Sequence, residues 1–188
     1  MDTAQRDLEH TLAYHGAPAL AGIKPADLIA WGTPQTCTSP FFQEYCTQLA
    51  LRGIQLRVMC TGRPRCLLLV YRPDQLERQL ADGAVRALLL REGYPVDQGL
   101  EAMLTALGRR LSEGSFPHEV GLFLGYPPED VEGFRLHQGR DYKLCGCWKV
   151  YSDVERARQC FRRYGLCRAA LCRRIQEGKP LVQVFRVA

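Results

Sequence analysis

Two short apolar segments around a glycine–proline turn constrain the fold of this chain most. Residues 55–60 and 66–71 are strand-like and flank Thr61–Arg65, which contains Gly62 and Pro64. A short connection with glycine and proline between two such segments is typical of a hairpin. The second segment contains the unbroken apolar run Leu67–Val70, a pattern typical of a strand in the centre of its sheet. We therefore expect a hairpin whose second strand is central.

The rest of the chain alternates short strand candidates with helices. Further strands are expected at 28–31, 143–151 and 181–185. Apolar periodicity, proline and glycine signals predict helices at 3–15, from Ser39 or Pro40 to 52, from 73 to a break at Gly83, then at 84–91, 97–111, 118–124 and 128–137. With one clear hairpin and interspersed helices, the pattern favours an α+β fold over a doubly wound one. We expect one domain, 1–188, with a small, mostly antiparallel sheet packed against helices.

The final helix carries the positive charge of the chain. Ser152–Glu155 has the sequence of a capping box, and the helix is expected to run to about Glu177, with a possible break at Gly165. Residues 152–179 hold eight basic and three acidic side chains, which accounts for the whole net charge of +5. Such a face is typical of contact with an acidic protein, nucleic acid or a membrane surface, or of simple solvation. Arg156, Arg163 and Arg174 are the candidate partner-binding residues.

Five of the nine cysteines fall within 28 residues: Cys145, Cys147, Cys160, Cys167 and Cys172. If 143–151 is one strand, Cys145 and Cys147 face the same side. The group could hold zinc or an iron–sulfur cluster. No C-x2-C pair is present, and free cysteine is often simply buried, so both readings stay open.

Two histidine motifs are the best candidates for chemistry. His118–Glu119 opens an expected helix, where free amides favour an anion or an activated water, and His15 ends the first helix. Together they could bind a divalent metal or haem iron, or act as acid–base groups assisted by Lys149 or Tyr151; alternatively, they only complement helix ends. A cationic pocket for phosphate or carboxylate could form if four residues at strand ends and turns converge. These are Lys24, Arg72, Lys143 and Lys149.

Two sequence features bear on the location of the chain. No apolar run approaches the roughly 18–20 residues that span a bilayer, and the first residues lack the apolar core of a secretory signal. We expect a cytoplasmic protein with reduced thiols.

Four segments resemble a known family when taken in order. They are 15–24 (HGAPALAGIK), 69–72 (LVYR), 116–127 (FPHEVGLFLGYP) and 148–151 (WKVY). The chain resembles the bacterial domain-of-unknown-function family 3793 over nearly its whole length. The resemblance implies a cytosolic bacterial protein without an assigned activity, and similar proteins often accompany flavodoxin and iron-handling genes.

Three hypotheses about function follow. The first is an accessory protein of iron or redox metabolism, which binds a ligand, metal or haem near His15, Lys24, His118 and Glu119 and an acidic redox partner such as a flavodoxin through its basic helix. The second is a hydrolase or transferase with His118 and Glu119 as acid–base groups, although no nucleophile motif accompanies them. The third is a nucleic-acid binder; no nucleic-acid motif supports it.

Overall fold

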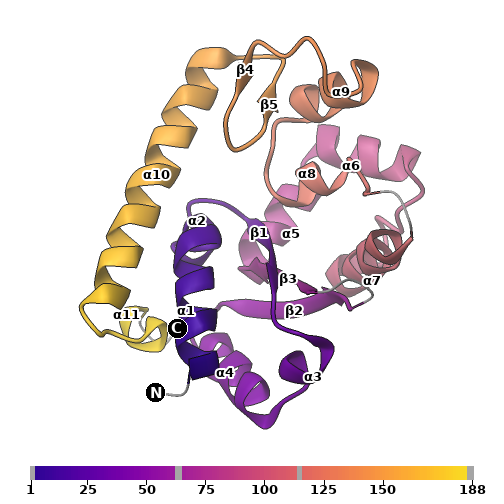
Figure 1. The fold of residues 1–188 in the computed structure, drawn as a ribbon. Coiled ribbons are helices and arrows are strands. Elements are labelled where there is room, and N and C mark those ends of the chain that lie inside the picture. The colour runs from indigo at the N-terminus through magenta and orange to yellow at the C-terminus, as the bar shows by residue number, and fades with distance from the viewer. Residues whose placement is uncertain (1–2, 62–64, 114–115, 186–188) are drawn as a thin grey trace.

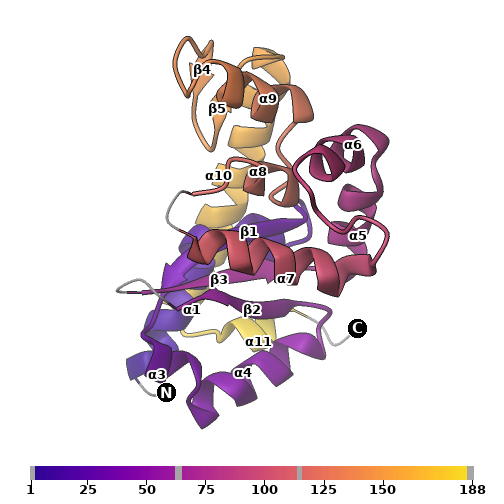
Figure 2. The same ribbon diagram turned by 90° about the vertical axis from the view of Figure 1, so that its right-hand side faces the viewer.

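In the computed structural model, which describes residues 3–61, 65–113 and 116–185, a three-stranded sheet lies between two layers of helices (Figures 1 and 2). The strands are β1 (Ala26–Trp31), β2 (Gln55–Cys60), β3 (Cys66–Tyr71), β4 (Leu144–Cys145) and β5 (Lys149–Val150). The helices are α1 (Thr3–His15), α2 (Ala17–Leu20), α3 (Pro34–Cys37), α4 (Pro40–Ala50), α5 (Pro73–Ala81), α6 (Gly83–Arg91), α7 (Gly99–Ser112), α8 (Val120–Phe123), α9 (Pro128–Leu136), α10 (Val154–Gln176) and α11 (Leu181–Val184). The expected α+β class is confirmed. None of the helices within these ranges combines the length and apolar character needed to cross a bilayer.

The expected hairpin is confirmed, and β3 is central, with antiparallel partners β1 and β2 on its two sides. Residues 62–64 of the connection lie outside the described part of the chain. Helices cover both faces of the sheet, which explains the unbroken apolar run. Leu68 and Val70 pack with α1, α2, α4 and α11, whereas Leu69 and Tyr71 pack with α5, α6, α7 and α8.

A third, smaller cluster lies beyond the sheet. It joins the β4–β5 hairpin to the first half of α10 through Trp148, Val150, Ala157 and Tyr164. In Figure 1, α10 runs along the molecule from this hairpin to α11, so it connects the small cluster to the main core. Its inner stripe packs on α1 and α2.

Four local predictions are corrected. Residues 143–151 form the β4–β5 hairpin and not one strand, so Cys145 lies in β4 while Cys147 lies in the turn. Residues 181–184 form the helix α11 and not a strand. A short apolar run after a proline is compatible with a strand or a helix, and here the packing of the fully buried Leu181 favours the helix. The first correction replaces one expected strand by two short ones, and the second replaces an expected strand by a helix.

The remaining two corrections concern α10. Asp153, and not Ser152, caps this helix, with its carboxylate accepting from the amide of Arg156 at 3.0 Å. The Ser152 amide is committed elsewhere, to Asp130 at 2.7 Å. The helix also continues without a break through Gly165. An added Cβ at this position would meet nothing within 4 Å, so no close contact with another segment requires a glycine here.

Candidate functional site

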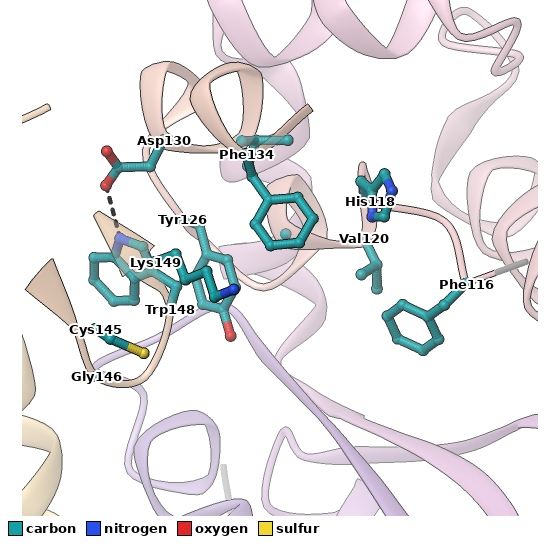
Figure 3. A pocket seen from close by; sticks show the side chains of 12 residues that line it. Phe116, His118, Val120, Tyr126, Asp130, Phe134, Cys145, Gly146, Trp148 and Lys149 are labelled. Carbon is teal, nitrogen blue, oxygen red and sulfur yellow. Dashed lines mark hydrogen bonds between the residues drawn. The ribbon is translucent and has the colours of Figure 1, made fainter. Parts of the chain in front are cut away.

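The most apolar of the cavities lies between the loop before α8, α9 and the β4–β5 hairpin (Figure 3). Its volume is about 270 Å³, at the small end of the range for ligand pockets. It is lined by Phe116, His118, Val120, Gly121, Tyr126, Asp130, Val131, Phe134, Cys145, Gly146, Trp148 and Lys149. We call it the aromatic pocket, because five of these side chains carry rings.

The rings contact one another and form walls. Tyr126 stacks on Trp148 with centroids 4.9 Å apart and an interplanar angle of 27°. His118 and Phe134 are 4.9 Å apart and tilted by 54°. The Tyr126 hydroxyl also donates to the carbonyl of Cys147 at 3.2 Å, which fixes the hairpin turn beside the ring. Walls of this kind favour a flat aromatic ligand, because offset stacking adds to the burial of apolar area.

Glycine lets the chain segments approach closely around the pocket. A Cβ on Gly121 would lie 2.9 Å from both Tyr126 and Val131. One on Gly146 would lie 2.2–2.9 Å from the ring of Phe161, so the hairpin rests directly on α10. Both positions therefore need the absence of a side chain.

A buried carboxylate, Asp130, holds the hairpin in place. It is 2% exposed, and accepts from the indole N–H of Trp148 and from the amides of Tyr151 and Ser152, each at 2.7 Å. One side chain of α9 therefore fixes a wall of the pocket and the start of α10. Sequence reasoning missed this residue, because α9 also carries the charged residues Glu129, Glu132 and Arg135, among which Asp130 is not distinctive.

Lys149 is the cation of the pocket wall. Its ammonium donates to the carbonyl of Gly139 at 2.7 Å and lies 5.6 Å from the ring centroid of Phe134 and 5.1 Å from that of Tyr142. The loop that it contacts contains Gln138 and Asp141, the two non-glycine residues with positive φ in the described chain. Such conformations cost free energy and cluster at functional sites.

The structure places the predicted pair His118 and Glu119 just before α8, where both line a small cavity of about 100 Å³, but only His118 also lines the aromatic pocket. His118 is exposed and lines the aromatic pocket. Glu119 accepts from Arg110 at 2.9 Å and from the hydroxyl of Tyr94 at 3.1 Å. Burial and the Glu119 charge raise the pKa of Tyr94. Glu119 is thus tied to α7 and to the segment after α6.

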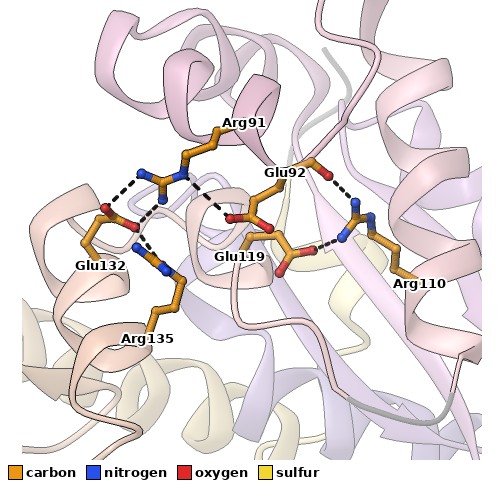
Figure 4. A network of polar contacts seen from close by, with 6 residues as sticks. All are labelled: Arg91, Glu92, Arg110, Glu119, Glu132 and Arg135. Atoms are coloured by element: carbon orange, nitrogen blue, oxygen red, sulfur yellow. Dashed lines mark hydrogen bonds and ion pairs between the residues drawn. The ribbon is translucent and has the colours of Figure 1, made fainter.

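Glu119 belongs to a wider network of ion pairs on this side of the molecule (Figure 4). Arg91 of α6 meets Glu132 of α9 at 2.5 Å, and Arg135 meets the same carboxylate at 3.2 Å. Hydrogen bonds from Arg91 hold the pKa of the Glu132 carboxyl below its ordinary value. The network connects α6 to α9, so these ion pairs have a structural role.

The other predicted ligand residues lie elsewhere. His15 is exposed at the end of α1, against the ring of Tyr14 at 4.8 Å, and does not line the aromatic pocket. Arg72 donates to the carbonyls of Leu20 and Arg52. Tyr151 stacks on His137 at 5.4 Å, and its buried hydroxyl finds no partner among the described residues.

The four proposed cations do not form one pocket. Lys24 is buried in an ion pair with Asp27, and Lys143 donates to the carbonyl of Ser152 at 3.1 Å. A polar cavity of about 590 Å³ instead joins Lys24 to Arg78 and Arg156. Two acidic residues, Asp82 and Glu129, also line this cavity and offset part of its positive charge.

The cysteines are free thiols. Within the described ranges, no three His, Cys, Asp or Glu side chains gather as a metal site requires. Cys145 and Cys147 are exposed, whereas Cys160, Cys167 and Cys172 are partly buried. Burial raises the pKa of the Cys147 thiol, although Lys24 and Arg168 act in the opposite direction. Cys160, Cys167 and Cys172 therefore pack partly against the core, whereas Cys145 and Cys147 lie at the surface.

The predicted partner residues Arg156, Arg163 and Arg174 are exposed along α10. No ion pair engages any of the three in the part of the chain that the structure describes. Arg156 lines the polar cavity, whereas Leu166 lies between Arg163 and Arg174 along α10 and is 67% exposed. The outer surface of α10, defined by Arg163, Leu166 and Arg174, thus carries two cations without ion pairs beside one exposed apolar side chain.

Comparison with known proteins identifies one family model. The model described as "Protein of unknown function (DUF3793)" matches residues 12–185. No curated protein and no solved structure matches the chain.

Proposed function

The chain belongs to the DUF3793 family of proteins of unknown function, and we propose that it is an accessory protein that binds a small planar aromatic ligand. The observation that carries the proposal is the aromatic pocket, whose walls come from the loop before α8, from α9 and from the β4–β5 hairpin. A mostly apolar concave site with few polar groups is the usual form of a small-molecule site. Asp130 ties the hairpin to α9, so the walls are held before any ligand arrives.

We extend the proposal to iron or redox metabolism in the cytoplasm, on the basis of the gene association that the family resemblance implies. A flavin ring or a smaller fused ring system has the flat shape that the walls favour. Haem is a weaker candidate, because a cavity of about 270 Å³ is small for a macrocycle.

The test uses Phe134, which supplies a pocket wall from α9. Phe134→Leu keeps an apolar side chain but removes the stacking surface, so we expect about tenfold weaker binding of riboflavin or naphthalene-2-carboxamide, equal to about 1.4 kcal/mol. Isothermal titration calorimetry measures the change. Leu136→Ala is the matched control on the same helix, because Leu136 is 68% exposed and does not line the pocket. Absence of binding by the parent protein would overturn the proposal.

The acid–base alternative has less support. Glu119 is engaged by Arg110 and Tyr94, with its side chain 12% exposed, and His15 does not line the aromatic pocket with His118. A general base needs its carboxylate within reach of a substrate proton. A binding role therefore fits these contacts better than a hydrolase or transferase.

A second part of the proposal concerns the outer surface of α10, which we assign to an acidic protein partner. Its support is the pair of exposed arginines without ion-pair partners among the described residues, Arg163 and Arg174, beside the exposed Leu166. Protein interfaces commonly combine an apolar centre with a polar rim, and opposite charge speeds their association. On the basis of the family resemblance, we propose that this partner is a flavodoxin-like redox protein.

Charge reversal tests the partner surface. In Arg163→Glu/Arg174→Glu we expect association with a purified flavodoxin to slow about tenfold or more at low salt, and the difference to shrink as salt rises. Surface plasmon resonance gives the rates. Arg140→Glu is the control, since Arg140 is exposed but lies outside α10. Equal rates would contradict the assignment, and steeply salt-dependent binding of duplex DNA instead would favour the nucleic-acid alternative.

A further inference from the structure

The donor capacity of Lys149 is only partly used. An ammonium carries three N–H donors, and its one hydrogen-bond acceptor among the described residues is the carbonyl of Gly139 at 2.7 Å. The side chain is half-buried and lines the aromatic pocket. Donors therefore remain for a group inside the pocket.

The other charges of the pocket do not neutralise this ammonium. Asp130 is the acidic residue of the lining, and its two carboxylate oxygens already accept from three N–H groups. Figure 3 shows its carboxylate turned toward Trp148, on the far side of the pocket from His118. Lys149 also has no acidic ion-pair partner among the described residues. The pocket thus presents one cation with free donors beside apolar rings.

The surroundings also discriminate against a cation. Aromatic rings attract ammonium groups, and the rings of Phe134 and Tyr142 already face the Lys149 ammonium. A second cation in this small space would be repelled at short range. A neutral ligand could offer Lys149 only an uncharged acceptor, which bonds an ammonium less strongly than an anionic oxygen does.

We propose that the ligand of the aromatic pocket is a planar aromatic anion, whose ring packs beside Phe134 and Trp148 and whose carboxylate or phosphate accepts from Lys149. The inference rests on the proposed binding function and adds the charge of the ligand. Hydrogen bonds between an ammonium and an anionic oxygen are about twice as strong as neutral ones, so Lys149 determines which planar molecules bind.

Lys149 also has a structural contact, and the test must separate the two roles. Its bond to Gly139 helps to hold the loop that contains Gln138 and Asp141. A variant that only loosens this loop would weaken every ligand alike. A variant that removes an anion contact would weaken charged ligands selectively.

Two ligands of equal shape provide the measurement: naphthalene-2-carboxylate and naphthalene-2-carboxamide. We expect the parent protein to bind the carboxylate about tenfold more tightly in calorimetry, and this preference to fall as salt is raised. In Lys149→Met, we expect the two dissociation constants to agree within about twofold. Lys149→Arg, which keeps the charge, should keep the preference, and Lys143→Met is the control lysine outside the pocket.

Each outcome decides one claim. If the parent binds both ligands equally, or if Lys149→Met still prefers the carboxylate while Lys143→Met behaves like the parent, the anion inference is overturned and the proposed function stands. If neither ligand binds the parent, the proposed function and the inference both fail. Circular dichroism of each variant, together with its affinity for the carboxamide, shows whether the pocket is intact.

Discussion

Asp130→Ala is expected to lower the free energy of unfolding by about 3–5 kcal/mol. The carboxylate is 2% exposed and accepts from Trp148, Tyr151 and Ser152. Each hydrogen bond to a charged group contributes about 1.5–3 kcal/mol, and water that enters the vacated space recovers part of the loss. The variant should also loosen the hairpin wall of the aromatic pocket, because Trp148 loses its polar contact.

Urea unfolding followed by circular dichroism measures this change, and tryptophan fluorescence reports on the surroundings of the indole. Glu129→Ala is the matched control, since Glu129 is the exposed neighbour on the same helix, and it should change stability by less than about 0.5 kcal/mol. Asp130→Asn should be intermediate, since the amide keeps an acceptor but has fewer acceptor sites. Equal stability of Asp130→Ala and Glu129→Ala would show that the three hydrogen bonds contribute little.

The sequence predicted the central sheet well because its signals are local. Alternation, glycine–proline turns and apolar runs determined β1, β2, β3 and most of the helices, and helices on both faces account for the run at 67–70. The prediction was wrong at 143–151, because one long strand and two short hairpin strands give the same alternation of side chains along the sequence. Gly146 was the available turn signal there.

The candidate site was harder to predict because its contacts are distant in sequence. His118 and Lys149 were singled out, and both line the aromatic pocket. Phe134, Asp130 and Trp148 were missed, because an aromatic residue on a helix or strand usually indicates packing and an acidic residue on a helix usually indicates solvation. The Asp130–Trp148 bond joins residues 18 apart through a buried contact, and periodicity carries no information about such a pair.

The buried pair Lys24–Asp27 gives the second large expected effect. Lys24 is 6% and Asp27 is 7% exposed. The ammonium donates to the carboxylate and lies 5.2 Å from the ring centroid of Tyr126, while Asp27 also accepts from the amide of Ala19 at 3.2 Å. Lys24→Met would leave a buried carboxylate without its counter-ion, and we expect a loss of about 3–5 kcal/mol near pH 7.

The loss should depend on pH in a defined direction. Burial raises the pKa of Asp27 above its ordinary value of 3.8, against the lowering effect of Lys24. An acid with a raised pKa in the folded state binds its proton more tightly there than in the unfolded chain, so its contribution to stability falls as pH rises through that window. In the Lys24→Met variant, the lowering effect of Lys24 is lost and the pKa of Asp27 rises further. The deficit of Lys24→Met should therefore be smaller at about pH 4.5 than at about pH 7.5, since a larger fraction of the Asp27 carboxyl carries a proton in the folded state at the lower pH.

Urea unfolding of the parent and the variant at both pH values measures the deficit. The double variant Lys24→Met/Asp27→Asn removes both charges, and we expect it to be within about 1–2 kcal/mol of the parent, because a buried ion pair can often be replaced by uncharged groups at little cost. Its deficit should also be the same at both pH values, since the titrating group is gone. A deficit of the single variant that does not change with pH, or a double variant less stable than the single one, would show that Lys24 acts through packing and not through the charge of Asp27.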